Sequence, residues 1–419
     1  MATLLYDIRT PFPLPSHPDG GLGASAAIDE GRAITLRHPG YPDQSNIMLV
    51  FPALDPLPIL AASSVDATTV HFGFHHETAR IACAIVANCR WDGFLSEEKQ
   101  GQAKPVSLGP DDILPARNYY FHVPPDTDIL NKYPTVPSFG HFQFPHNNLP
   151  SFWTSLRFPR PQNLPRLSSF DQAVLARDVS CRISRNTLGT ETAHLVPRAE
   201  EVWFSMNQMS QYSSQPEALG ANATDDVRNA ILLRSDLHGV FDQRRFALVP
   251  KAGVWVIHTL SGLPSDELAS LYHNVTLQPL CGLAVEYVFA RFAWTVLAQG
   301  TFLRAGVPRR LVVVEGEENV MHVKNVSGLE CRTKFVPTLA VTKSRSQSPK
   351  KRARDDVDED NELEEILYDD EDKGDENMWN CRGRQRKRRN GGPISLPTAT
   401  NFNHWRDMSP QEELFTYST

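Results

Sequence analysis

The sequence predicts an α+β protein built from three regions of different composition. Residues 1–160 combine short strand-like runs with many prolines, and residues 166–340 combine helix candidates with a strand hairpin. Residues 342–419 are rich in charges of both signs. At 419 residues the chain is long enough for two or three domains and a buried core. We therefore expect a β-rich N-terminal domain, a mixed central domain and a charged tail.

The N-terminal region contains three strand-like runs, which begin at Arg32 (RAITLRH), Ser45 (SNIMLVF) and Asn118 (NYYFHV). Residues 77–88 predict a helix, because one face of that segment repeats at spacings of three and four. The stretch 133–165 is rich in Pro, Phe and Asn, which predicts an irregular connector. None of these features assigns a role to residues 1–160.

The central region predicts more regular elements. We expect helices over residues 169–178, 198–212, 236–243 and 283–303, a strand over 190–196, and a hairpin of the runs that begin at Arg245 and Val254. The last helix contains charged residues, which favour packing inside a protein over a membrane span. The core of the expected motif covers residues 181–260.

Several side chains of the central region are expected to serve the core. Trp203, Met206 and Met209 recur every three residues on an expected helix, which indicates one buried face. Cys181 has no cysteine partner at metal-binding spacing and is expected to be a small buried apolar residue. We also expect structural roles for His258 and His273. The six cysteines form no C-x-x-C pair, which excludes a four-cysteine zinc site.

The C-terminal region alternates in charge. Its acidic run, residues 355–376, holds 14 Asp and Glu against one Lys. Basic clusters flank this run, from Lys350 to Arg354 (KKRAR) and from Arg384 to Arg389 (RQRKRR). Blocks of like charge repel themselves and have little to bury, so we expect disorder. The two clusters are typical of nuclear import signals, although phosphate contacts and a merely solvated tail are alternatives.

Composition and charge exclude some classes of protein. The net charge of −7 argues against coating nucleic acid by bulk charge, since phosphates are neutralised by a basic surface. Residues 175–260 hold nine basic and nine acidic residues, so this segment is neutral. The first residues lack a charged leader followed by an apolar core, and the early apolar stretch is interrupted by prolines. We expect a protein that is neither secreted nor embedded in a membrane.

The chemistry of the chain concentrates in four polar residues, His194, Asn229, His238 and Asp242. His238 and Asp242 are four residues apart on an expected helix, so both can hold one divalent ion. A histidine beside such an ion can deprotonate water while the metal stabilises charge on a phosphate. The amide of Asn229 can orient that histidine or hold its loop.

The order His, Asn, His within ETAHLVP, RNAILLRSDLH and GVFD resembles the HNH endonuclease family, as found in the HNH nuclease domain-containing proteins of filamentous fungi. The resemblance covers about 80 to 100 residues strongly and extends more loosely to HPGYPDQS, ACAIVANCRWDGFLS and NYYFHVPP. It implies a ββα-metal fold in the central domain, with His194 as general base, Asn229 as orienting amide and His238 as metal ligand.

The sequence also departs from the family pattern. Many members place a metal ligand directly before the base, where this chain has Ala193. Glu191 or Asp242 is then the candidate oxygen ligand. The gap of 44 positions between His194 and His238 is long and predicts an inserted helix.

The leading hypothesis is a nuclear or nucleocytoplasmic endonuclease that hydrolyses phosphodiester bonds in DNA with Mg²⁺, Mn²⁺ or Zn²⁺. Its expected partners are DNA and, through the basic clusters, a nuclear import receptor. The alternative, favoured by Ala193, is a noncatalytic nuclear protein that keeps the HNH fold to bind nucleic acid or protein. A third possibility is a regulatory protein that acts mainly through its charged tail.

Overall fold

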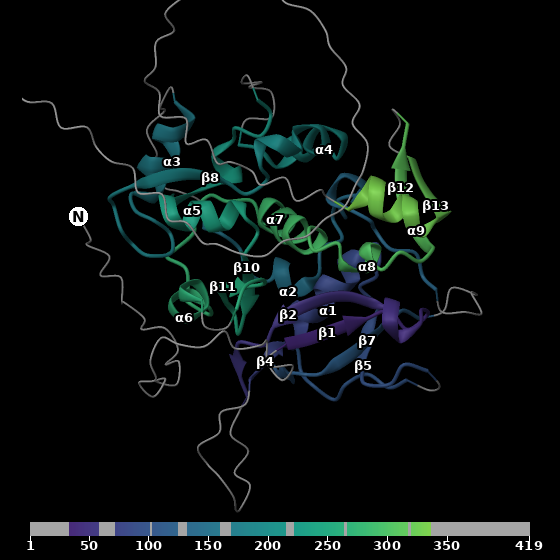
Figure 1. The fold of residues 1–419 in the computed structure, drawn as a ribbon. Helices are drawn as coiled ribbons and strands as arrows, with labels where there is room; N and C mark the ends of the chain where they lie inside the picture. The colour runs from purple at the N-terminus through teal and green to yellow at the C-terminus, as the bar shows by residue number, and fades with distance from the viewer. Residues whose placement is uncertain are drawn as a thin grey trace, which may run out of the picture. The chain divides into compact units, whose positions relative to one another are not determined.

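The computed structural model describes residues 33–57, 72–100, 103–124, 132–159, 169–214, 222–263, 266–316 and 320–336 (Figure 1). Contacts divide the chain into residues 1–343 and residues 344–419, and every described residue belongs to the first unit. Helices and sheets are mixed along this unit, which confirms the predicted α+β class. The predicted charged tail and its basic clusters lie outside the described residues.

The N-terminal region forms two small sheets. The first contains, in spatial order, β2 (Ile47–Pro52), β1 (Ala33–Arg37), β7 (Asn118–His122) and β5 (Phe94–Ser96), with the short 3₁₀ turn η2 (Asp43–Ser45) between β1 and β2. The second contains β3 (Asp55–Pro56), β4 (Phe72–His75) and β6 (Ile113–Pro115). The β1–β7 pair is parallel and the other pairs are antiparallel. All three strand-like runs predicted from sequence therefore form strands.

Helix α1 (His76–Val86) follows β4 directly and is buried along almost its whole length. The His75 side chain caps it by accepting a hydrogen bond from the Thr78 N–H at 3.3 Å. The helix ends before the predicted residue 88, because Asn88 and Cys89 adopt left-handed φ values of 60° and 59°. Helix α1 packs against α7 (Val285–Leu297).

The connector after β7 is irregular over residues 132–159, as predicted, apart from the turn η3 (Phe139–His141) and the single-turn helix α2 (Ser151–Thr154). Its buried Trp153 packs on α7, with the ring centroid 5.3 Å from that of Phe292. Irregular backbone is tolerated here because aromatic side chains anchor it to the core.

The central region supplies a ββα unit. The unit consists of β8 (Thr190–His194), β9 (Ala230–Arg234) and α5 (Ser235–Asp242). The other elements of this part of the chain are α3 (Phe170–Asp178), η4 (Arg198–Glu200), α4 (Glu201–Met206), η5 (Met209–Tyr212) and η6 (Val227–Asn229). Strands β8 and β9 pair antiparallel, and α5 packs against both (Figure 1). Helix α4 lies in the chain between the two strands, which confirms the inserted helix expected from the long His194–His238 gap.

The next elements are the hairpin of β10 (Phe246–Lys251) and β11 (Val254–Thr259), followed by α6 (Glu267–Tyr272). The two-residue turn between the strands places Ala252 at φ 46° and Gly253 at φ 77°. Two successive positive φ values suit the twist of a tight hairpin, and glycine adopts them without steric cost. The hairpin predicted from sequence is confirmed.

The end of the described chain contains α7, α8 (Thr301–Arg304), β12 (Arg309–Glu315), β13 (Val320–Val326), the short helix α9 (Gly328–Glu330) and one π turn, η7 (Cys331–Phe335). The single helix expected over 283–303 is wrong, because Gly300 takes a left-handed φ of 58° and separates α7 from α8. Strands β12 and β13 pair antiparallel. These two strands were not predicted from the sequence. No helix in the described ranges is long and apolar enough to cross a membrane.

The core predictions for α4 hold in part. Trp203 and Met209 are buried, but Met206 is 39% exposed, which corrects its assignment to the core. A spacing of three suits a continuous helix, whereas α4 ends at Met206 and Met209 begins a separate 3₁₀ turn. Cys181 is fully buried, as expected.

One hydrophobic core contains side chains from both the N-terminal and the central regions. Polar contacts also cross between them: the Lys251 ammonium of β10 donates to Asp55 Oδ1 of β3 at 2.7 Å. The domain boundary expected near residue 160 stays a prediction.

Candidate nuclease site

His194 ends β8, where its backbone pairs with Ala230 of β9. Its Nε2 lies 2.9 Å from Asp225 Oδ1, and its ring stacks on Phe170 with centroids 5.1 Å apart. A carboxylate accepts, so Nε2 carries the proton and Nδ1 carries the lone pair. The side chain is 16% exposed. The predicted base is thus held by its ring face and by one nitrogen.

The electrostatic surroundings keep His194 neutral. Burial lowers its pKa, and the hydrogen bond and negative charge of Asp225 only partly offset this effect. Asp225 in turn accepts two hydrogen bonds from Arg198, at 2.7 and 2.6 Å. Burial alone would raise the pKa of Asp225, but its bonds to Arg198 and His194 outweigh burial and lower it. Near neutral pH the site holds a neutral imidazole beside an ionised carboxylate.

Asn229 is fully buried at the end of η6, just before β9. Its Oδ1 accepts from the Val196 N–H at 2.9 Å, and its Nδ2 donates to the carbonyls of Val196 and Thr224 at 3.0 and 2.9 Å. The Leu195 N–H also donates to the Asn229 carbonyl at 2.7 Å. These bonds fix the chain directly after His194. The structure therefore places Asn229 where a loop-holding amide is expected, because its side-chain hydrogen bonds go to backbone groups of Val196 and Thr224 and not to the imidazole.

His238 lies on α5 between two carboxylates. Its Nδ1 is 2.9 Å from Glu191 Oε2 on β8, and its Nε2 is 3.3 Å from Asp242 Oδ2 one helical turn onward. Glu191 and Ala193 point to the same face of β8, because side chains alternate along a strand. Glu191 therefore reaches the helix from the strand face that Ala193 also occupies.

The charges around His238 act together. Burial by itself lowers its pKa, but the hydrogen bonds with Asp242 and Glu191 outweigh burial and raise it. Burial likewise favours the neutral form of Asp242, yet His238 and Arg291 lower its pKa overall. The three groups His238, Glu191 and Asp242 thus form a charged cluster between strand β8 and helix α5.

Arg291 of α7 connects the two halves of the site. It is buried, it donates to the Phe241 carbonyl, and its Nη1 lies 3.4 Å from the carbonyls of both His194 and Leu195. Its Nη2 is 3.6 Å from Asp242 Oδ1. Burial lowers its pKa to about 9, so it remains cationic at neutral pH. Arg291 therefore links the backbone of the base to the carboxylate beside His238.

The donor set fits a divalent metal ion. Imidazole and carboxylate groups are ligands of Mg²⁺, Mn²⁺ and Zn²⁺ sites in different proportions. A metal-bound histidine usually donates its second ring N–H to a carboxylate. Since Glu191 and Asp242 lie at opposite nitrogens of His238, one can share the ion with His238 while the other accepts that N–H.

A second group of potential ligands lies elsewhere. Among the described residues, Asp55, His258 and His273 are buried and offer ligand atoms within 4.8 Å of one another. However, Asp55 Oδ1 already lies within hydrogen-bonding distance of Lys251, Asn274 and His273, at 2.7, 2.8 and 3.2 Å. The Lys251 ammonium beside that oxygen repels a second cation, so we interpret this group as a structural hydrogen-bond network and not as a metal site. The burial of His258 and His273 agrees with the structural role expected for them.

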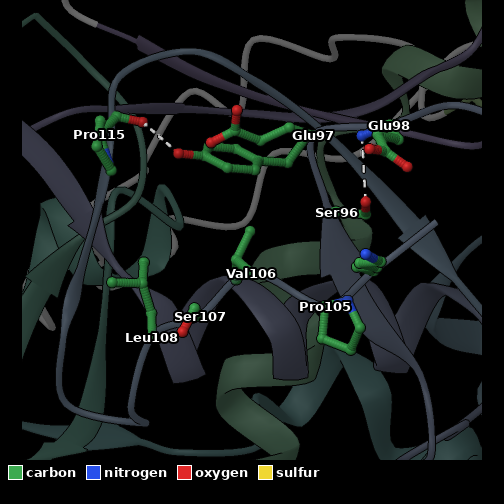
Figure 2. A pocket seen from close by; sticks show the side chains of 10 residues that line it. Ser96, Glu97, Glu98, Pro105, Val106, Ser107, Leu108 and Pro115 are labelled. Atoms are coloured by element: carbon green, nitrogen blue, oxygen red, sulfur yellow. Dashed lines mark hydrogen bonds between the residues drawn. The ribbon is translucent and has the colours of Figure 1, made fainter.

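A pocket of about 420 Å³ lies in the N-terminal region and is separate from this site (Figure 2). Its lining includes Ser96, Val106 and Tyr119, and the Tyr119 hydroxyl donates to the Pro115 carbonyl at 3.1 Å. None of its lining residues is a predicted site residue. We therefore assign the candidate chemistry to the ββα unit.

Comparison with known families supports this assignment. Residues 178–249 match the model of the family described as HNH endonuclease, which confirms the resemblance over this segment. The matched segment contains β8, β9 and α5 and all five predicted site residues. No curated protein and no solved structure matches the chain. The match indicates a nuclease domain in general, which implies nucleic-acid binding, and HNH domains as a class are generally metal-dependent.

The structure thus brings Glu191 and Asp242 each into contact with His238, and it joins Asn229 to the backbone directly after His194. Sequence reasoning missed Asp225 and Arg291. Asp225 stands 31 residues from His194 in a loop, and no spacing rule signals that contact. Arg291 did carry a signal, since a charged residue inside an apolar helix needs a buried partner.

Proposed function

We propose that the protein is a metal-dependent endonuclease that hydrolyses phosphodiester bonds in DNA. The observation that carries the proposal is that one ββα unit carries both His194, at the end of β8, and His238, on α5. His194 presents a neutral imidazole at the end of β8, and His238 stands between two carboxylates on α5. A base and an anionic metal-binding cluster are the two parts that such hydrolysis needs.

In this mechanism Nδ1 of His194 removes a proton from water, and the resulting hydroxide attacks phosphorus as the bond to the leaving oxygen breaks. Asp225 stabilises the imidazolium that forms. Asn229 keeps the strand end in place through Val196. His238, with Glu191 or Asp242, would hold a divalent ion, which would supply charge stabilisation to the phosphate and the leaving oxygen. This imidazole and carboxylate donor set is compatible with Mg²⁺, Mn²⁺ or Zn²⁺.

The test is nicking of supercoiled plasmid by the full-length protein with Mg²⁺, Mn²⁺, Ni²⁺ or Zn²⁺. We expect cleavage that chelation abolishes. His194→Ala should reduce it by at least about 100-fold, the typical contribution of a general base, and His238→Ala should reduce it strongly through loss of the metal ion. Cleavage that survives His194→Ala unchanged contradicts the assignment of the base. Parallel assays on single-stranded DNA and RNA define the substrate.

The second candidate function is noncatalytic binding of nucleic acid or protein through the same fold. The specific observation in its favour is Ala193, which is fully buried at the position where many relatives carry a ligand. Calorimetry with Mn²⁺ discriminates the two functions. A folded protein that binds DNA but no divalent ion supports the noncatalytic function.

We also propose a nuclear location, which rests on the sequence of the two basic clusters from Lys350 to Arg354 and from Arg384 to Arg389. An import receptor would bind them by charge. A fluorescent fusion of the full chain should be nuclear, and Ala substitution of both clusters should release it to the cytoplasm. Nuclear accumulation that persists after both substitutions contradicts this proposal.

A further inference from the structure

We propose that Asp225 is a positioning residue for the base. In this inference the Asp225 carboxylate, fixed by Arg198, holds His194 so that Nδ1 is the nitrogen that accepts a proton from water. The catalytic consequence rests on the proposed function, whereas the orientation of the imidazole does not.

The geometry restrains the ring from several directions. Phe170 of α3 stacks on one face, the backbone is paired with β9, and Asp225 occupies the Nε2 edge at 2.9 Å. Asp225 is itself immobilised, because the Arg198 guanidinium binds both of its carboxylate oxygens. Such a bidentate pair sets direction as well as distance. The ring can then present only Nδ1 to an incoming water.

The charges explain why this arrangement serves a base. The charged and titratable groups that act on His194 are Asp225, Arg198 and His238. Arg198 keeps Asp225 ionised, so Asp225 accepts the hydrogen bond without taking the proton. When Nδ1 gains a proton, the imidazolium lies beside that negative carboxylate. This attraction favours the proton-transfer state over the ground state, in which the imidazole is neutral.

The neighbouring Asp226 has a different task and provides a matched control. Its carboxylate accepts from the N–H and hydroxyl of Ser214 and from the Arg228 N–H, where it caps η6. These contacts hold the loop that carries Asp225. Asp226 therefore stabilises the loop, whereas the adjacent Asp225 orients the base.

The kinetic experiment compares wild type, Asp225→Asn and Asp226→Asn in plasmid nicking across pH. Asp225→Asn should reduce kcat by about 10- to 100-fold with little change in KM, and should move the acidic limb of the pH profile to lower pH. Asp226→Asn should lower thermal stability and leave the limb in place. An Asp225→Asn profile that coincides with wild type overturns the inference.

The role of Arg198 is tested by a double-mutant cycle with Arg198→Ala. If Arg198 acts through Asp225, the double variant should be no slower than Asp225→Asn alone. Independent, multiplicative losses would contradict the fixing role of Arg198.

A second readout needs no activity. Diethyl pyrocarbonate modifies neutral imidazoles, and peptide mass spectrometry follows His194 in the full-length protein as pH varies, with exposed His322 as internal reference. In Asp225→Asn the half-modification pH of His194 should fall, while that of His322 stays constant. An unchanged His194 curve overturns the inference whether or not the protein cleaves DNA. A shifted curve in a protein without nuclease activity upholds the positioning and refutes the proposed function.

Discussion

Asn229 binds the backbone of Val196 with both ends of its side-chain amide, accepting at 2.9 Å and donating at 3.0 Å. Val196 follows His194 by two residues, so this pair ties the base-bearing strand to the start of β9. The amide thus acts on the backbone that directly follows His194, the proposed base.

The first prediction follows from that pair. Asn229→Ala should lower the free energy of unfolding by about 2 kcal/mol or more, because the Val196 N–H and two carbonyls lose buried partners. Nicking should be lost in parallel. Urea denaturation and the plasmid assay measure both effects. Asn222→Ala is the matched control, since it removes a less buried side chain from the same loop and should cost clearly less.

The second prediction concerns the carboxylates at His238. Glu191→Gln and Asp242→Asn should each weaken Mn²⁺ binding by about 10- to 100-fold, since one is a metal ligand and the other orients the imidazole. Isothermal titration calorimetry measures the change. Glu201→Gln, an exposed substitution on α4, should leave the affinity unaltered. Equal affinity in all variants would contradict metal binding at His238.

The third prediction concerns Arg291. Arg291→Ala should destabilise the fold by about 2–5 kcal/mol, because it leaves a cavity in place of a large buried side chain and leaves the Phe241 carbonyl without a donor. Arg291→Met, which keeps much of the volume and the contacts with Phe241 and Trp294, should cost less. Denaturation curves give both values. A loss below about 1 kcal/mol for Arg291→Ala would show that the buried guanidinium is not a structural link.

The fourth prediction is a loss of stability in acid. Burial lowers the pKa of His38 to about 3 and that of His75 to about 4, and it lowers the pKa of His258 well below its usual value. The unfolded chain binds these protons near pH 6.5, so the stabilisation is complete above that pH and is lost as pH falls toward the folded values. Each histidine contributes up to about 1.4 kcal/mol per pH unit.

Denaturation at pH 7.5, 6.0 and 5.0 tests this dependence. His258 has no hydrogen-bond partner for either ring nitrogen within the described structure and packs edge-on against Phe74. His258→Phe should therefore preserve the fold at pH 7.5. It should also reduce the dependence of the unfolding free energy on pH, because one proton fewer is taken up on unfolding. If the unfolding free energy of His258→Phe depends on pH as it does in wild type, His258 does not contribute to the loss of stability in acid.

The sequence by itself determined the parts of the fold that depend on local pattern. Alternation and turn residues located the β10–β11 hairpin, and spacing located α1 and α5. The ordered residues His194, Asn229 and His238 indicated the ββα unit. The hairpin and the helices were predictable because each arises within a few residues, where backbone geometry and capping dominate. The ββα unit, which spans many more residues, was predicted from the resemblance to the HNH family.

Only the tertiary structure decided how the site is assembled. It joined Asp225 to His194 across 31 residues, Glu191 to His238 across 47, and Arg291 to the carbonyl of Phe241 across 50. It also left Met206 exposed and separated α7 from α8. Such contacts depend on how buried charges find partners when elements pack, and a linear sequence does not contain that geometry. The chain thus supplies the chemical groups, and packing decides which nitrogen and which carboxylate face each other.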